Sequence, residues 1–212
     1  MIRHHLSDAL LTGYGAGTLP EAFNLLVATH VSLCDECRAR LQAQEAVGGW
    51  LLDSCDTAPM AADSLNATLA RIAGAAPERP APRPSRGLFP QPLRDYVGGD
   101  AETVRWRSVG GGVRQAILPT SRGASARLLY IPAGTAVPDH GHQGNELTLV
   151  LSGAFSDATD RFGPGDVEIA DQSLEHTPVA EPGAPCICLA VTDAPLRFNG
   201  LIPRLLQPFL KI

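Results

Sequence analysis

The sequence has no long apolar run and no excess of positive charge. No stretch of its 212 residues approaches the roughly 18 apolar residues of a membrane span, and no charged segment followed by an apolar one opens the chain as in a signal peptide. The formal net charge is -5 and the sequence pI is about 5.6. These absences argue against a membrane protein, a secreted protein and a protein that binds nucleic acid broadly through its phosphates. We therefore expect a cytoplasmic protein whose acidic surface suits a basic protein partner.

The five cysteines are odd in number, and the reducing cytoplasm favours thiols or metal ligands over structural disulfides. Two of them, Cys34 and Cys37, lie close behind His30 in the stretch His-Val-Ser-Leu-Cys-Asp-Glu-Cys. Cysteines three apart lie on adjacent turns when they open a helix, and His30 at the end of a preceding helix can turn back toward them. Two thiolates and an imidazole suit tetrahedral zinc, and either His4 or His5 can supply a fourth ligand.

The first third of the chain shows helical periodicity. We expect four short helices: one capped by Ser7 or Asp8, one with Pro20 in its first turn, one from about Asp35 toward Leu52, and one capped by Asp63 or Ser64. The fourth helix carries an apolar stripe of Leu65, Leu69 and Ile72, with little nearby sequence to cover it. Such a stripe predicts a contact with a partner.

Composition changes twice along the rest of the chain. Residues 75–94 are rich in proline and arginine, which excludes a regular helix or a central strand and predicts a semi-extended linker. Beyond it, short β-type runs alternate with glycine and proline, as in an antiparallel sandwich or barrel. We predict an α+β multidomain chain: a helical zinc domain at 1–74, the linker at 75–94 and a β domain at 95–212. Both domains are acidic, with four basic against eight acidic residues in 1–74 and six against thirteen in 95–195.

The β domain contains two motifs that resemble those of the cupins. The spacing Gly-x5-His-x-His-x3-Glu-x6-Gly, from Gly134 to Gly153, matches the first cupin motif, and Gly163-Pro-Gly-Asp with His176 ten residues later resembles the second. A cupin is a double-sheet jelly roll. The resemblance implies a metal site of three histidines and one glutamate: His140, His142, Glu146 and His176. These ligands suit iron, manganese, nickel, copper or zinc, and family resemblance favours zinc. Ala180 departs from the asparagine that many cupins carry there, but it is not a ligand.

The N-terminal region also resembles a known domain. His5, followed by His30-x3-Cys34-x2-Cys37 within four short helices, is similar to the zinc-binding anti-sigma domain, and that alignment favours His5 over His4. Joined to a cupin domain, this layout resembles the ChrR-type anti-sigma factors over almost the whole chain. The resemblance implies a negative regulator of transcription that inhibits an extracytoplasmic-function sigma factor, as a 1:1 heterodimer, and releases it under singlet oxygen or related oxidative stress. It implies no enzyme activity and no direct contact with nucleic acid.

Two other functions compete with this interpretation. A cupin oxygenase with a helical appendage is one, but an oxygenase has no need for a helical zinc domain on a tether. A free-standing redox sensor is the other. It would use Cys34 and Cys37 as a thioredoxin-like pair, which lacks its usual strand-helix-strand setting here, or Cys186 and Cys188, which we expect to act mainly as small core residues. Cys55 stands alone and is expected to be a thiol without function.

Overall fold

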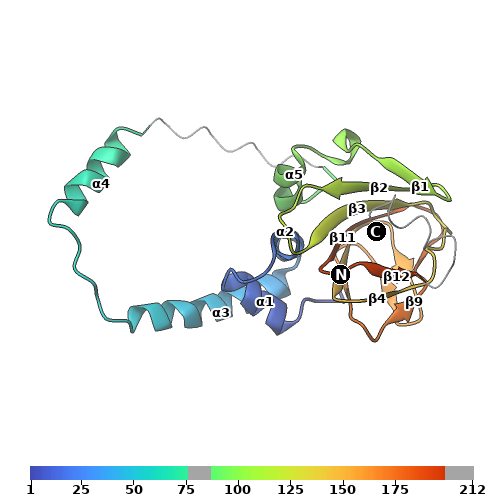
Figure 1. The fold of residues 1–212 in the computed structure, drawn as a ribbon, viewed down its shortest axis with the longest axis horizontal. Helices are drawn as coiled ribbons and strands as arrows, with labels where there is room; N and C mark the ends of the chain where they lie inside the picture. The colour runs from blue at the N-terminus through green and yellow to red at the C-terminus, as the bar shows by residue number, and fades with distance from the viewer. Residues whose placement is uncertain (76–86, 199–212) are drawn as a thin grey trace.

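The computed structural model describes residues 1–75 and 87–198. The N-terminal part forms the four helices expected from the sequence (Figure 1): α1 (Asp8–Gly15), α2 (Glu21–Leu33), α3 (Asp35–Asp53) and α4 (Ser64–Ala73). Ser7 caps α1, because its hydroxyl accepts the backbone N–H of Leu10 at 3.3 Å. Cys34 separates α2 from α3, and its sulfur accepts the N–H of Cys37 at 3.4 Å in the position of an N-cap.

A fifth helix, α5 (Gln91–Val97), lies where the sequence predicted none. It begins directly after Pro90, has Pro92 in its first turn, and ends at Gly98 with a φ of 77°. Proline is favoured in a first turn because the N–H that it lacks has no partner in the helix. The expectation that residues 75–94 contain no regular helix is therefore wrong at its end. The middle of the expected linker, residues 76–86, lies outside the described residues.

The C-terminal part is antiparallel β structure, as predicted. A short 3-10 helix (Ala101–Thr103) precedes its strands, which are β1 (Arg107–Gly110), β2 (Val113–Leu118), β3 (Ser125–Ile131), β4 (His140–His142), β5 (Glu146–Ser152), β6 (Phe155–Ser156), β7 (Arg161–Phe162), β8 (Val167–Ala170), β9 (Glu175–His176), β10 (Val179–Ala180), β11 (Cys186–Thr192) and β12 (Leu196–Phe198). One sheet has the order β1-β2-β3-β11-β5-β8, and two smaller sheets have the orders β10-β6-β7 and β12-β4-β9. The small sheets face the large one and complete a jelly roll (Figure 1).

The large sheet is covered on both faces. Side chains alternate between faces along a strand, so on β3 Leu128 belongs to the core shared with the helices, whereas Arg127 and Leu129 line a cavity between the sheets. The same alternation on β11 places Leu189 and Val191 toward the helices and Cys188 and Ala190 toward the cavity. Strands buried on both faces have nearly continuous apolar sequences. This explains the run Cys-Ile-Cys-Leu-Ala-Val of β11.

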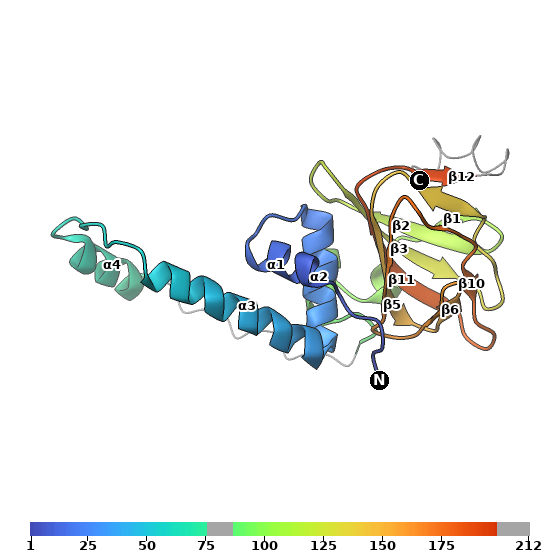
Figure 2. The same cartoon turned by 90° about the horizontal axis from the view of Figure 1, so that it is seen from below.

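Helix α2 packs against the outer face of the large sheet, over β11, β5 and β3, and α5 packs beside it. Figure 2 shows α2 along the sheet and α3 extending away from it. Leu26 of α2 and Leu93 of α5 are fully buried in one core with the strands. At the start of α2, the Glu21 carboxylate accepts the Tyr96 hydroxyl at 2.8 Å and the N–H of Ser121 at 2.6 Å. The helices and the sheet are therefore joined by a hydrophobic core and by the hydrogen bonds of Glu21.

Helix α4 lies beyond the far end of α3, away from the sheet (Figure 1). It has no buried residue, and the relative exposures of Leu65, Leu69 and Ile72 are 68%, 53% and 66%. The predicted apolar stripe is therefore open to solvent. Within residues 1–75 and 87–198, no helix has the length and apolar character of a membrane span.

The shared core makes a prediction about stability. Leu26→Ala removes a fully buried side chain between α2 and the sheet, and such truncations cost about 2–5 kcal/mol. We expect chemical denaturation to show that loss of unfolding free energy, with the helical signal and the Trp106 signal, read in a Trp50→Phe background, shifted together. Leu69→Ala, on the exposed face of α4, is the matched control and should change stability by less than about 0.5 kcal/mol. A shift of the helical signal alone would show that the core is not shared.

Candidate metal centres

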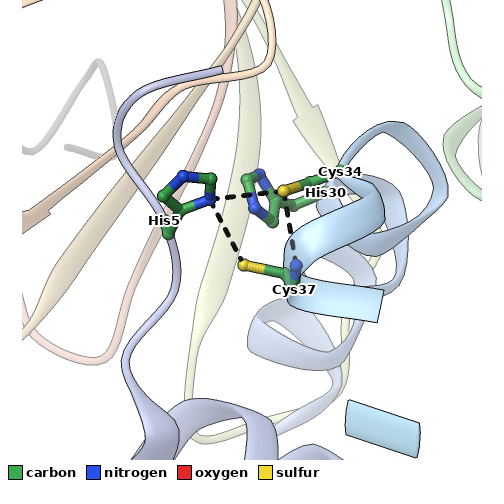
Figure 3. Close-up of side chains that lie close together, drawn as sticks. All are labelled: His5, His30, Cys34 and Cys37. Carbon is green, nitrogen blue, oxygen red and sulfur yellow. Dashed lines mark hydrogen bonds between the residues drawn. The ribbon is translucent and has the colours of Figure 1, made fainter. Parts of the chain in front are cut away.

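The first centre brings together the four N-terminal residues singled out in the sequence (Figure 3). His5 lies in the extended segment before α1, His30 in the last turn of α2, Cys34 at the junction and Cys37 in the first turn of α3. One ligand atom from each lies within 4.8 Å of the others. Nδ1 of His5 is 3.3 Å from Sγ of Cys34 and 3.7 Å from Sγ of Cys37. The groups converge on one point, as a tetrahedral site requires.

Neighbouring groups orient both imidazoles of this centre. Nε2 of His5 lies 3.3 Å from a carboxylate oxygen of Glu36, so Nδ1 faces the sulfurs. The two ring nitrogens of His30 are used the other way round, because Nδ1 lies 2.9 Å from the carbonyl of Gly165 and donates to it. Its buried Nε2 has no hydrogen-bond partner within the described part of the chain. Each histidine therefore offers one nitrogen to the centre and uses the other to fix its ring, a pattern common at metal sites.

The electrostatics of this centre favour a bound cation. Burial lowers the pKa of His30 to about 4, so its imidazole is neutral and keeps a lone pair. Burial, together with the nearby Cys34, raises the pKa of Cys37 to about 11, so a thiolate is costly there without positive charge. A divalent metal would supply that charge, and two sulfurs with two imidazoles are a donor set that zinc prefers. The residues present therefore fit zinc.

His4, the alternative fourth ligand, points away from the cysteines. Its Nε2 lies 3.0 Å from a carboxylate oxygen of Asp160, and its ring packs on Phe162 with centroids 4.4 Å apart. Both partners belong to the jelly roll. Between His4 and His5, the geometry therefore favours His5 as the ligand.

The second centre lies inside the jelly roll. His140 and His142 come from β4, and His176 comes from the neighbouring strand β9, where it pairs directly with His140. The three rings are buried, with centroids 4.8 to 5.3 Å apart, and one nitrogen from each lies within 4.8 Å of the others. Burial lowers the pKa values of His140 and His142 to about 4, so both are neutral donors at pH 7.

Glu146, the fourth residue of the cupin pattern, lies beside these rings at the start of β5. Its carboxylate is 3.7 Å from Nδ1 of His142 and lines the same cavity, although it is not part of the close group of three histidines. Burial raises its pKa to about 7. A divalent cation between the rings and this carboxylate would favour its charged form. The orphaned Nε2 atoms of His142 and His176, buried among the described residues, also fit a metal.

Two acidic residues that the sequence analysis missed hold His176. Its Nδ1 lies 2.7 Å from a carboxylate oxygen of Asp157 and 3.1 Å from one of Glu168, which directs Nε2 toward the other histidines. Burial lowers the pKa of His176, but these two carboxylates outweigh it and raise the pKa to about 9. Glu168 had a signal in the sequence, namely an acidic residue inside the apolar strand β8. Asp157 had none, because its contact depends on the fold.

The cavity beside the second centre has a volume of about 330 Å³ and a largely apolar wall. Cys188 contributes to this wall, and Cys186 is buried next to it along β11. Their burial agrees with the expected role as small core residues. Cys55, by contrast, is exposed.

Known proteins resemble the chain over its whole length. The anti-sigma-E factor ChrR of Cereibacter sphaeroides is 65% identical over 214 residues, covering 100% of this chain and 99% of that protein. A crystal structure of Rhodobacter sphaeroides SigE in complex with the anti-sigma ChrR matches with a TM-score of 0.82 and 61% identity, over 91% of this chain and 100% of that one. Residues 95–195 match the family of the ChrR cupin-like domain. The chain therefore belongs to the ChrR family of anti-sigma factors.

Proposed function

We propose that this protein binds and inhibits an extracytoplasmic-function sigma factor in a 1:1 complex in the cytoplasm, and releases it under singlet oxygen or related oxidative stress. The observation that carries the proposal is the exposed apolar surface of the outer helices in a chain 65% identical to an anti-sigma-E factor. The role is regulatory and needs no catalytic turnover. It requires a surface that binds the sigma factor and a second place where the signal acts.

The outer helices provide a surface for a partner. Leu65, Leu69 and Ile72 recur at i, i+4 and i+7 along α4, so they form one face of that helix. The far half of α3 adds Val47, Trp50 and Leu51, whose relative exposures are 60%, 67% and 55%. An amphipathic helix that lays its apolar face into a groove is a common mode of protein recognition. We define these six residues as the outer apolar surface.

Charge also favours a sigma factor as the partner. Residues 1–74 carry eight acidic against four basic residues. A sigma factor contacts the DNA backbone and is expected to carry basic surfaces for that purpose. Opposite charges on two partners increase the association rate and oppose the binding of wrong partners. The helical part would then cover the surface with which the sigma factor meets DNA or polymerase.

Zinc at the N-terminal centre would act by fixing helix directions. His5, His30, Cys34 and Cys37 belong to three pieces of chain, namely the first segment, the end of α2 and the start of α3. Bound zinc supplies positive charge for the thiolates and holds these pieces together. Because α3 starts at the centre and carries α4 beyond its far end, the orientation of the outer apolar surface depends on the centre (Figure 1).

We place signal reception in the jelly roll. The metal of its centre, which we propose is also zinc, would be held by His140, His142, His176 and Glu146 beside the apolar cavity. Cys188 in the cavity wall carries a thiol, a group that reactive oxygen species can oxidise. This centre lies on the inner side of the large sheet, whereas the helices lie on the outer side. Binding and sensing can therefore be separated by mutation.

Loss of the N-terminal metal should abolish binding of the sigma factor. We expect Cys34→Ala with Cys37→Ala to lose one zinc per chain in metal analysis and to weaken sigma binding by at least 100-fold in a titration. The matched control is Cys55→Ala, which removes an exposed thiol and should leave both values unchanged. Wild-type affinity in the double variant would exclude a structural role of zinc in binding.

A charge introduced into the outer apolar surface should weaken binding of the sigma factor without affecting the fold. Leu69→Asp places a charge in the centre of the α4 stripe, where we expect the hot spot of the interface, and loss of a hot-spot residue costs about 2 kcal/mol or more. We expect an affinity loss of at least tenfold and an unchanged midpoint of denaturation, because the side chain is exposed in the free protein. Arg71→Ala, elsewhere on the same helix, serves as the control. Equal affinities of Leu69→Asp and wild type would move the interface away from α4.

Loss of the jelly-roll centre should leave binding intact and impair release. We expect His142→Ala to repress a sigma-dependent reporter as wild type does and to lose most of its induction by singlet oxygen. Glu175→Gln, an exposed acidic residue beside the centre, is the control and should respond normally. Full induction of His142→Ala, at normal protein level and with zinc in the N-terminal centre, would remove the jelly-roll metal from the mechanism.

A further inference from the structure

One short segment, residues 165–168, contacts both candidate metal centres, and we call it the bridging segment. On its first side it holds the N-terminal centre. The carbonyl of Gly165 accepts Nδ1–H of His30 at 2.9 Å. The carboxylate of Asp166 accepts the backbone N–H groups of Arg3 and His4 at 2.6 and 3.0 Å. The bridging segment thereby fixes His30 directly and fixes His5 through the backbone that precedes it.

Two further contacts complete this link to the N-terminal segment. The N–H of Val167 donates to the carbonyl of His4 at 3.2 Å. Gly165 has a φ of 91°, and a Cβ atom there would lie 2.6 Å from the side chain of Ile2. Only glycine allows this conformation and this close approach without strain. The N-terminal segment is therefore seated on the bridging segment from Ile2 to His4.

On its other side the bridging segment reaches the jelly-roll centre. Glu168 is buried, and its carboxylate lies 3.1 Å from Nδ1 of His176, which directs Nε2 of that ring toward His140 and His142. Only Val167 separates Glu168 from Asp166, which lies directly before β8, so a short stretch of backbone joins the two contacts. A displacement of one residue along this strand must move the other.

The bridging segment is rigid enough to transmit such a displacement. Gly165 and Asp166 form backbone hydrogen bonds with Val150 at 2.8 and 3.0 Å, and the Asp166 carboxylate accepts the N–H of Gly163 at 2.8 Å. Asp166 and Glu168 are both buried, with relative exposures of 5% and 6%. Packed elements of this kind change position as units and do not deform gradually.

We propose that Asp166 and Glu168 are positioning residues that couple the two metal centres, so that a metal in the jelly-roll centre raises the metal affinity of the N-terminal centre. The biological part of this inference rests on the proposed function, because it supplies the route by which a signal in the jelly roll reaches the sigma-binding helices. The coupling itself concerns two metal affinities in the free protein and does not need a sigma factor.

The sign of the coupling follows from the contacts. Nδ1–H of His176 donates to Asp157 at 2.7 Å and lies 3.1 Å from a carboxylate oxygen of Glu168. A metal held on Nε2 would fix this ring and, through the contact with Glu168, the start of β8. The fixed strand holds Gly165 and Asp166 where they orient His30 and the segment before His5. When a metal then binds the N-terminal centre, less conformational entropy is lost, because its ligands are already ordered. By linkage, a metal in the N-terminal centre raises the affinity of the jelly-roll centre by the same factor. A variant without the jelly-roll centre still binds the sigma factor where zinc is in excess, because the weakened N-terminal centre then still fills.

Cobalt(II) tests the coupling, because thiolate-to-cobalt charge transfer reports on the N-terminal centre. The full-length double variant Cys34→Ser with Cys37→Ser must lack the band, which assigns it to that centre. We would measure the cobalt affinity from this band in full-length wild-type protein, whose jelly-roll centre fills, and in full-length His140→Ala, whose jelly-roll centre does not. We expect the affinity of the N-terminal centre to be about 5- to 150-fold lower in His140→Ala, the usual range of coupling between sites. Cobalt affinities that differ by less than twofold between the two proteins overturn the proposal.

The roles of Asp166 and Glu168 are tested by the affinity ratio, which is the cobalt affinity of the N-terminal centre with an intact jelly-roll centre divided by that with His140→Ala. We expect the ratio to fall toward one in an Asp166→Asn background, because the amide is a weaker acceptor for the N–H groups of Arg3 and His4. Asp160→Asn is the matched control, since it removes a contact to the His4 side chain and none to that backbone, and it should retain the wild-type ratio. If Asp166→Asn does not fold, Glu168→Gln gives the same test from the other side of the segment. An unchanged affinity ratio in the folded variant overturns the coupling role of Asp166 and Glu168. The proposed function is tested separately, by measuring the affinity for the sigma factor.

Discussion

The structure depends on how one buried imidazole, that of His30, is held. The ring is fully buried, and each nitrogen has a defined direction: Nδ1 donates to the carbonyl of Gly165, and Nε2 faces the thiols of Cys34 and Cys37. A metal held by Nε2 and the two sulfurs would join the end of α2 to the start of α3, while the hydrogen bond on Nδ1 joins α2 to the jelly roll. The helices and the sheet share this contact in addition to their hydrophobic core.

This arrangement separates the functions in space but keeps them connected. Helix α3 has 19 residues and is about 28 Å long at the usual rise per residue. It begins at the N-terminal centre and carries the outer apolar surface far from the sheet, where a partner can reach it (Figure 2). A small change of direction at its base becomes a large displacement at its far end. A regulator built in this way needs no motion of the whole jelly roll to change its binding surface.

The sequence predicted those features that depend on local chemistry. Apolar periodicity and the capping Ser7 located the first helices, and ligand spacing brought His30, Cys34 and Cys37 together. Features set by tertiary contacts were not predictable in this way. The proline-rich composition of residues 75–94 argued against a helix, so α5 was not predicted, although Pro92 suits a first turn. The choice between His4 and His5 depends on Asp166, more than a hundred residues away, and the packing of α2 on the sheet has no local signal.

Binding of a sigma factor should require the metal that orders the helices. The most direct measurement is a calorimetric titration of an extracytoplasmic-function sigma factor from the same genome into the full-length protein, before chelation, after chelation, and after zinc is restored. We expect a 1:1 complex that is lost with the metal and regained with zinc. Equal affinity of the metal-free protein, with its helical content intact, would contradict it.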